Sequence, residues 1–292
     1  MDQVQAMQQQ EKLNYKRCDY FSEVSLVDDP GAVDSWCRYK MVEWCYEVVD
    51  FIDFSRDTVH IAMSYLDRFL GTGSIRSKEV VRNRKEYQLC AMTCLYIAVK
   101  MFEPKMIDTL LLAQLSRGSY LPQEFQRMEL EILFELNWHL NDPTPNSFLE
   151  LFVELLPLSQ CKMQIDETTL KEHARYQIEL SVVEYDIMLH DPSNIAIAAL
   201  SNTLNSIFTA HEAAAEGAEM IQELEKIAKA DLQKPFMRKI CHGMERLHNT
   251  KIPVIVRRSC PAPLQQKNTA EVKYGRERLA SHGEISPNCT LH

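Results

Sequence analysis

The chain has 292 residues, of which 46% are hydrophobic and 25% are charged. This length allows two cores of roughly 100 residues each, so two domains plus tails are expected. The formal net charge of −9 argues against binding to nucleic-acid phosphates, and nucleic acid is not expected as a partner.

The nine cysteines are odd in number, and no signal peptide precedes them, which predicts reduced thiols in a nuclear or cytoplasmic protein. Cys90 and Cys94 lie one helical turn apart without a histidine or a second cysteine pair beside them. This spacing favours packing over half of a metal site, and neither metal nor cofactor is expected. The most apolar stretch, 89–101, is shorter than the roughly 20 residues of a membrane span, so no membrane partner is predicted.

Glycine and proline are sparse and apolar residues recur at helical spacing, which predicts an all-α protein. Residues 1–33 are interpreted as a polar N-terminal segment that ends in the turn signal Asp28-Asp-Pro-Gly31. A first helix is predicted from Asp34 or Ser35 to about Asp53, and a second from about Ser55 to the breaker at Gly71. Residues 74–86 are predicted to be a polar connector.

The third predicted helix, 87–102, is apolar on nearly all sides, which is typical of the central helix of a bundle. Helices at about 107–115 and 122–136 complete a five-helix domain over residues 34–142. A second domain, 143–250, repeats this rhythm with helices at about 147–156, 166–189, 192–209, 217–228 and 231–248. The two halves therefore look like structural copies, and residues 251–292 are predicted to be a flexible basic tail.

Three charged residues, Asp67, Lys100 and Glu129, lie on otherwise apolar helices. Burying a charge costs free energy unless a partner compensates it, so these residues require an explanation. The chain has no phosphate-binding glycine loop and no nucleophile elbow, and His190-Asp191 is interpreted as a loop pair. No catalytic residue is assigned, and the protein is expected to be a binding protein and not an enzyme.

Four stretches resemble the cyclin box: Tyr65-Leu-Asp-Arg-Phe-Leu70, the helix 91–100, Arg127-Met-Glu129 and Pro143-Thr-Pro-Asn-Ser-Phe-Leu149. The resemblance covers about residues 20–250. It implies tandem five-helix cyclin folds and a regulatory subunit that binds and activates a cyclin-dependent protein kinase in cell-cycle control.

The same resemblance implies roles for individual residues. Lys100 and Glu129 would bind the kinase main chain near its mobile αC helix, with Met101, Phe102 and Glu103 beside them. A lysine at the end of a helix and a carboxylate on a neighbouring helix can donate to and accept from a partner's backbone. The alternative is an internal pair of Glu129 with Lys100 or Arg127.

Arg38 and Asp67 resemble the family's internal ion pair, which joins the first two helices, and Leu89 matches a core leucine. A docking patch for substrates or inhibitors with Arg-x-Leu-type motifs is also implied, and its residues are Met41, Trp44, Glu47 and Gln88. Cys37 and Lys40 depart from the family pattern in this patch. The alternative is that Met41 and Trp44 face the core.

Two other functions stay open at this point. The first is a cyclin-fold transcription factor or scaffold without kinase activation, and the second is a degenerate cyclin that no longer binds a kinase. A transcription factor would carry a zinc ribbon and a basic face, whereas this chain lacks cysteine pairs with ribbon spacing and its boxes are acidic.

Overall fold

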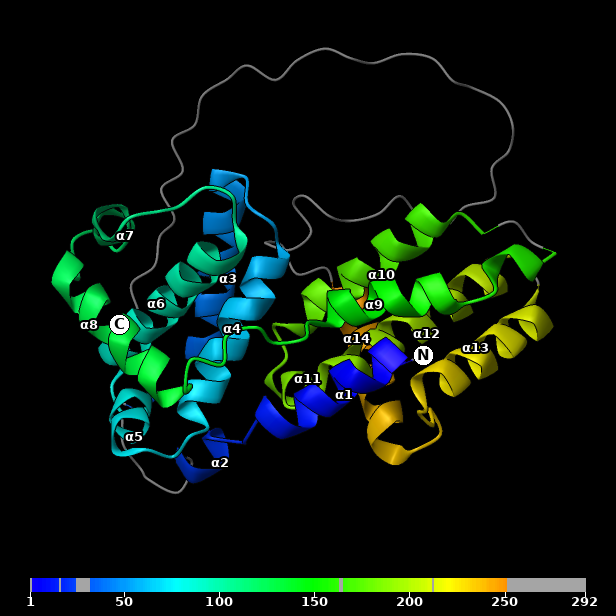
Figure 1. Cartoon of the computed structure of the whole chain (residues 1–292), viewed down its shortest axis with the longest axis horizontal. Helices are drawn as coiled ribbons and strands as arrows, with labels where there is room; N and C mark the ends of the chain where they lie inside the picture. The colour runs from blue at the N-terminus through cyan, green and yellow to red at the C-terminus, as the bar shows by residue number, and fades with distance from the viewer. Residues whose placement is uncertain (1, 16, 25–31, 163–164, 212, 251–292) are drawn as a thin grey trace, which may run out of the picture.

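A computed structural model describes residues 2–15, 17–24, 32–162, 165–211 and 213–250. Every regular element within these ranges is a helix, which confirms the all-α prediction. Figure 1 shows two helical bundles side by side, with α3 to α8 in one and α9 to α14 in the other. The predicted basic tail, 251–292, lies outside the described residues.

The first bundle contains the five predicted helices. They are α3 (Ser35–Ile52), α4 (Asp57–Leu70), α6 (Arg84–Phe102), α7 (Thr109–Leu115) and α8 (Pro122–Glu135). Asp34 begins α3 because its carboxylate accepts a hydrogen bond from the Cys37 N–H, and Asp53 ends it in the left-handed region at φ 66°. Residues 87–99 of α6 are all buried, as its all-round apolar pattern predicts.

The prediction of a polar connector at 74–86 is wrong, because α5 (Ile75–Val81) occupies much of it. The Ser74 hydroxyl caps this short helix by accepting from the Ser77 N–H, and Val80 and Val81 are buried. A segment of seven residues is too short to show a clear helical period among so many charged residues.

The second bundle has the same order, with a short helix between its second and third long helices. Its elements are α9 (Pro145–Leu155), a 3-10 turn (Leu158–Gln160), α10 (Glu167–Ser181), α11 (Tyr185–Met188), α12 (Pro192–Ala210), α13 (Ala214–Ala228) and α14 (Pro235–Thr250). The prediction of one continuous helix over 166–189 is wrong, because the chain turns between Ser181 and Tyr185. The corresponding central helices, α6 and α12, are both 19 residues long.

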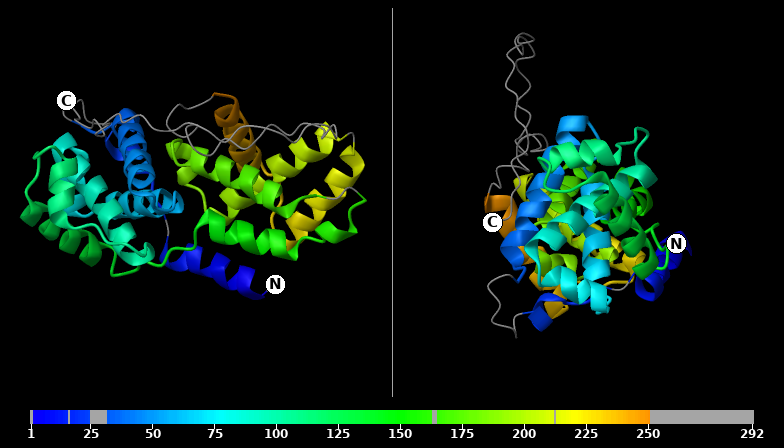
Figure 2. Two further views of the ribbon diagram at one scale, coloured as in Figure 1. Left: turned by 90° about the horizontal axis from the view of Figure 1, so that it is seen from above. Right: turned by 90° about the vertical axis from the view of Figure 1, so that its left-hand side faces the viewer.

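The N-terminal segment is not a simple linker, since it forms α1 (Asp2–Asn14) and α2 (Phe21–Val24). Figures 1 and 2 show α1 along the second bundle, although the first bundle follows it in sequence. The Gln8 amide donates to the Ala228 carbonyl at 2.9 Å, and Glu11 accepts from Ser193 at the start of α12. The N-terminal segment therefore contacts the second bundle, although it precedes the first bundle in sequence.

None of the described helices combines the length and the apolar character that crossing a bilayer requires.

Candidate functional site

Lys100 and Glu129 meet at the surface where α6 ends beside α8. The Lys100 ammonium lies 2.7 Å from a Glu129 carboxylate oxygen and 5.0 Å from the centre of the Tyr96 ring. The Lys100 side chain is 35% exposed and the Glu129 side chain 15% exposed. The structure thus brings the two predicted site residues together as an internal pair that solvent can reach.

The contact with Glu129 favours the charged form of Lys100. Partial burial acts to lower the pKa of Lys100, but the hydrogen bond and the charge of Glu129 outweigh it, so the pKa is raised. A partner that uses both groups must share or replace the bond between them. Lys100 can donate to a carbonyl, and Glu129 can accept from an N–H.

The three residues that follow Lys100 do not behave alike. Met101 is 51% exposed and Phe102 is 42% exposed, so both offer apolar area beside the ion pair. The Glu103 carboxylate instead accepts from the Ser55 N–H at 2.9 Å and from the Thr58 hydroxyl. Glu103 therefore ties the end of α6 to the start of α4, and its Oε1 oxygen is already used within the fold.

An exposed apolar ridge on α8 and the turn after it was not identified in the sequence. Leu130, Phe134 and Trp138 are each more than half exposed, and the rings of Phe134 and Trp138 lie 6.2 Å apart at 80°. Asn137 and Trp138 have φ values of 50° and 59°; asparagine tolerates this left-handed region, but it is strained for the bulky side chain of Trp138. The sequence signal for this ridge was that its three residues are spaced four apart, at positions that differ from those of the buried α8 residues.

Arg38 and Asp67 form the internal ion pair between α3 and α4. The Arg38 guanidinium donates to both carboxylate oxygens of Asp67, from Nε to Oδ1 at 3.1 Å and from Nη2 to Oδ2 at 2.8 Å. Both side chains are 1% exposed. Burial opposes the charge of Arg38, but the Asp67 carboxylate outweighs it and raises the pKa of Arg38. A two-pronged geometry of this kind is the strongest form of such a pair.

The Arg38–Asp67 pair also forms hydrogen bonds with residues outside α3 and α4. Arg38 Nη1 donates to the Val182 carbonyl of the second bundle at 2.7 Å, and the Tyr20 hydroxyl donates to Asp67 at 2.9 Å. A single buried charge cluster therefore joins the N-terminal segment, the first bundle and the second bundle. The sequence indicated only the contact between the first two helices.

A second buried pair was missed altogether. Arg68 donates to Asp142 at 2.5 Å and to the His139 carbonyl at 2.8 Å, while the Ser64 hydroxyl donates to Asp142 at 2.6 Å. These contacts fix the connection between the bundles against α4. Arg68 is the residue directly after Asp67, and Asp142 lies in the predicted boundary, so the residue types were visible although their pairing was not.

The predicted docking patch is not an exposed surface. Met41 and Trp44 lie in the core with at most 2% of their area exposed, so the prediction that they offer apolar contact to a peptide is wrong. Gln88 is buried and its amide oxygen accepts from the Tyr120 hydroxyl at 3.3 Å, whereas Glu47 is half-buried. Leu89 lies in the core, where the resemblance placed it.

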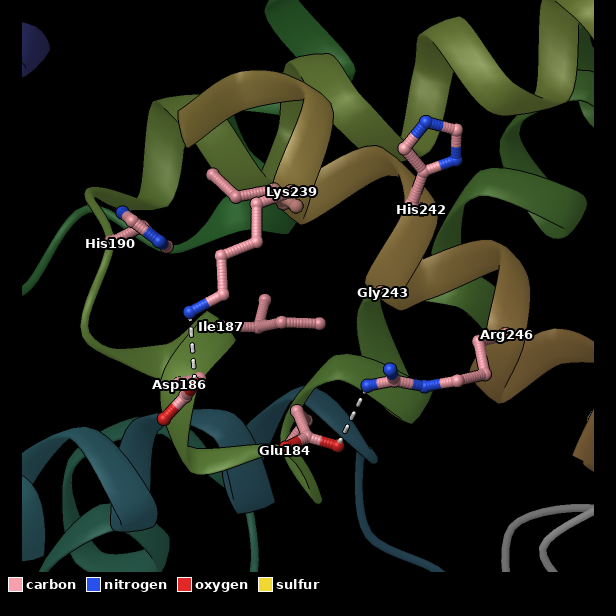
Figure 3. Close-up of a pocket in the computed structure, with 9 residues that line it drawn as sticks. Glu184, Asp186, Ile187, His190, Lys239, His242, Gly243 and Arg246 are labelled. Carbon is pink, nitrogen blue, oxygen red and sulfur yellow. Dashed lines mark hydrogen bonds and ion pairs between the residues drawn. The ribbon is translucent and has the colours of Figure 1, made fainter. Parts of the chain in front are cut away.

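A hollow of about 320 Å³ opens between α11 and α14 (Figure 3). Ile187 is one of the residues that line it, and two ion pairs join other lining residues: Asp186 with Lys239 at 3.0 Å and Glu184 with Arg246 at 3.7 Å. The charges of this lining therefore balance each other. Within the described part of the chain, here and elsewhere, His, Cys, Asp and Glu form no group of three that could hold a metal ion.

Comparisons with known proteins agree with this architecture. Residues 2–141 match the family described as "Cyclin, N-terminal domain", and residues 143–258 match "Cyclin, C-terminal domain". G1/S-specific cyclin-D2 of Xenopus laevis is 27% identical over 218 residues, which cover 74% of this chain and 69% of that protein. Putative cyclin-A3-1 of Arabidopsis thaliana is 30% identical over 170 residues, which cover 58% of this chain and 44% of that protein.

Among solved structures, a viral cyclin from herpesvirus saimiri has the same fold, with a TM-score of 0.62 at 17% identity over 85% of this chain and 96% of that one. The tandem five-helix prediction is therefore confirmed. With both domains matched in their proper order, this chain belongs to the cyclin family.

Proposed function

We propose that this chain is a non-catalytic regulatory subunit that binds and activates a cyclin-dependent protein kinase. The observation that carries the proposal is the solvent-accessible Lys100–Glu129 pair, bounded by the exposed apolar side chains of Met101 and Phe102. Charged anchors beside exposed apolar area suit a specific protein interface.

The two anchors suit recognition of a partner's backbone. On binding, the Lys100 ammonium donates to main-chain carbonyls of the kinase, and the Glu129 carboxylate accepts from main-chain N–H groups. Because each group already has a partner in the free protein, neither one is left unsatisfied and desolvated before the kinase arrives.

A second exposed apolar feature, the ridge of Leu130, Phe134 and Trp138, follows Glu129 in the chain on α8 and the turn after it. Exposed aromatic side chains are frequent centres of binding energy. A strained turn that holds Trp138 in the solvent is better explained by binding than by folding.

Catalysis belongs to the kinase in this proposal. Binding positions the kinase αC helix so that its glutamate pairs with the lysine that holds the ATP phosphates, which is the step that activates such enzymes. Relatives named as G1/S-specific cyclins support a role in the control of cell division.

The test is co-purification with candidate cyclin-dependent kinases and measurement of their activity. We expect the wild-type chain to bind and stimulate a kinase, and the Lys100→Ala, Glu129→Ala double variant to lose at least about tenfold in affinity. The matched control is the Glu223→Ala, Lys226→Ala double variant. It removes a surface ion pair of the second bundle in which the Lys226 ammonium lies 2.6 Å from a Glu223 carboxylate oxygen. The proposal fails if the wild-type chain stimulates no kinase, or if both double variants behave alike.

A further inference from the structure

The ring of Tyr96 lies beneath the Lys100 side chain, one helical turn earlier on α6. The Lys100 ammonium is 5.0 Å from the centre of this ring, and only 8% of Tyr96 is exposed. A side chain of an α-helix leans back over the turn that precedes it, so the lysine stem is directed across the ring. Because Tyr96 is packed within the core, the ring is a fixed surface and not a second mobile group.

The Lys100 ammonium therefore has two partners in the free protein. The Glu129 carboxylate of α8 holds it at 2.7 Å, and Tyr96 attracts it through the negative face of its ring. Burial acts to lower the pKa of Lys100, whereas Glu129 and, after it, Tyr96 act to raise it. The two partners differ in one respect. Glu129 is itself a candidate contact of the kinase, and the nearly buried Tyr96 is not.

We propose that Tyr96 is a positioning residue that holds Lys100 in its binding orientation when Glu129 turns to the kinase. The inference rests on the proposed function. When the Glu129 carboxylate accepts from N–H groups of a partner, Lys100 loses part of its counter-charge, and a lysine without a partner samples many rotamers. The Tyr96 ring stays in place, because it belongs to the same helix and to the core. The ammonium then meets a main-chain carbonyl from a fixed position, which lowers the entropic cost of binding.

A matched contact for comparison lies at the other end of α6. The Lys85 ammonium is 5.7 Å from the centre of the Tyr120 ring, and Tyr120 is 2% exposed. Lys85 is in the first turn of α6 and Lys100 in the last, so their backbones are roughly 20 Å apart along the helix axis. Replacing Tyr120 by leucine therefore removes a similar contact without changing the candidate kinase surface.

The first measurement uses the isolated full-length chain. In proton–carbon NMR spectra of lysine-labelled protein, the ε-CH2 signal of Lys100 is assigned with a Lys100→Arg variant. The Tyr96 ring should shift this signal upfield of the signals of exposed lysines, and Tyr96→Leu should return it to their position. Tyr96→Phe keeps the ring and should keep the shift. A wild-type signal without this shift, or one that Tyr96→Leu leaves in place, would overturn the inference.

The second measurement is kinase affinity in a double-mutant cycle. Tyr96→Leu should weaken binding about fivefold in the wild-type background and less than about 1.5-fold in the Lys100→Ala background, because its effect acts through Lys100. Tyr96→Phe should bind within about twofold of the wild type, since the ring is kept. Tyr120→Leu is the control and should bind like the wild type. Circular dichroism melting confirms that each variant is folded at the temperature of the measurement.

An equal loss of affinity in the two backgrounds would contradict the inference, because Tyr96 would then act through the packing of α6 and not through Lys100. Equal losses for Tyr96→Phe and Tyr96→Leu would contradict it as well. Failure of the proposed function has a different signature, which is a wild-type chain that binds no kinase. The inference then fails with it, whatever the NMR signal of Lys100 shows.

Discussion

The Glu11 carboxylate accepts hydrogen bonds from both the backbone N–H of Ser193, at 3.0 Å, and its hydroxyl, at 2.5 Å. Asp191, the residue at the N-cap of α12, makes no capping hydrogen bond with its own side chain. A residue of α1 therefore caps a helix about 180 positions away in the chain. This contact fastens the N-terminal segment to the second bundle.

A pH dependence follows from this contact. Burial raises the pKa of Glu11 from 4.5 to about 7, although the hydrogen bonds from Ser193 act to lower it. The folded state thus binds a proton that the unfolded state releases near pH 4.5, so this stabilising contribution is complete below that pH. It is lost as the pH rises through 7, by at most about 3 kcal/mol.

The measurement is urea unfolding of the wild type and of Glu11→Gln between about pH 5 and 8. The wild type should lose stability relative to the glutamine variant as the pH rises, because glutamine cannot ionise. All other titrating groups are common to both proteins and cancel in the difference. A difference that stays constant over this range would contradict the prediction.

Asp67→Ala should destabilise the protein by about 3 to 5 kcal/mol, because it leaves the guanidinium of Arg38 buried without its carboxylate. Denaturant unfolding measures the loss. Asp186→Ala, which breaks an exposed pair with Lys239, is the control and should cost less than about 1 kcal/mol. Replacing both partners, by Arg38→Met with Asp67→Leu, should cost less than Asp67→Ala alone, and the opposite order would contradict this account.

Lys100→Ala should separate stability from activity. The pair with Glu129 is partly exposed, so its loss should change the unfolding free energy by less than about 1 kcal/mol. Stimulation of the kinase should fall sharply in the same preparation. If stability and stimulation fell together, Lys100 would act through the fold and not through the interface.

Trp138→Gly should weaken kinase binding about tenfold, because it removes an exposed aromatic anchor. Its unfolding free energy should stay within about 0.5 kcal/mol of the wild type, since glycine tolerates the left-handed φ of this position. Isothermal titration with the kinase and denaturant unfolding give the two values. Leu13→Ala, a change at an exposed apolar residue of α1, is the control and should bind normally.

Local signals in the sequence located most helices of both bundles. Asp34 and Pro122 marked helix starts, and the all-round apolar pattern of residues 87–102 indicated a central helix. The short α5 and the break after Ser181 were missed, because elements of one or two turns carry too few residues to define a period. The polar α1 was missed because its stability depends on contacts with the second bundle, which no local pattern encodes.

The candidate site was predictable to the extent that the family resemblance supplied it. Lys100 and Glu129 were identified, and the structure shows that they form the internal ion pair that the sequence analysis gave as the alternative. The sequence did not indicate that Trp44 is buried whereas Trp36 is exposed. Both residues lie on the same amphipathic helix, and only its orientation against α6 decides which of them faces the core.

The hydrogen bond from Arg38 to the Val182 carbonyl has a consequence for how the chain unfolds. The Nη1 group of Arg38, which is buried in the first bundle, donates to a carbonyl of the second bundle. If either bundle unfolds, the other therefore loses a buried hydrogen bond. The two repeats should therefore melt in one cooperative transition, and a fragment restricted to residues 34–142 would retain a buried guanidinium without one of its acceptors.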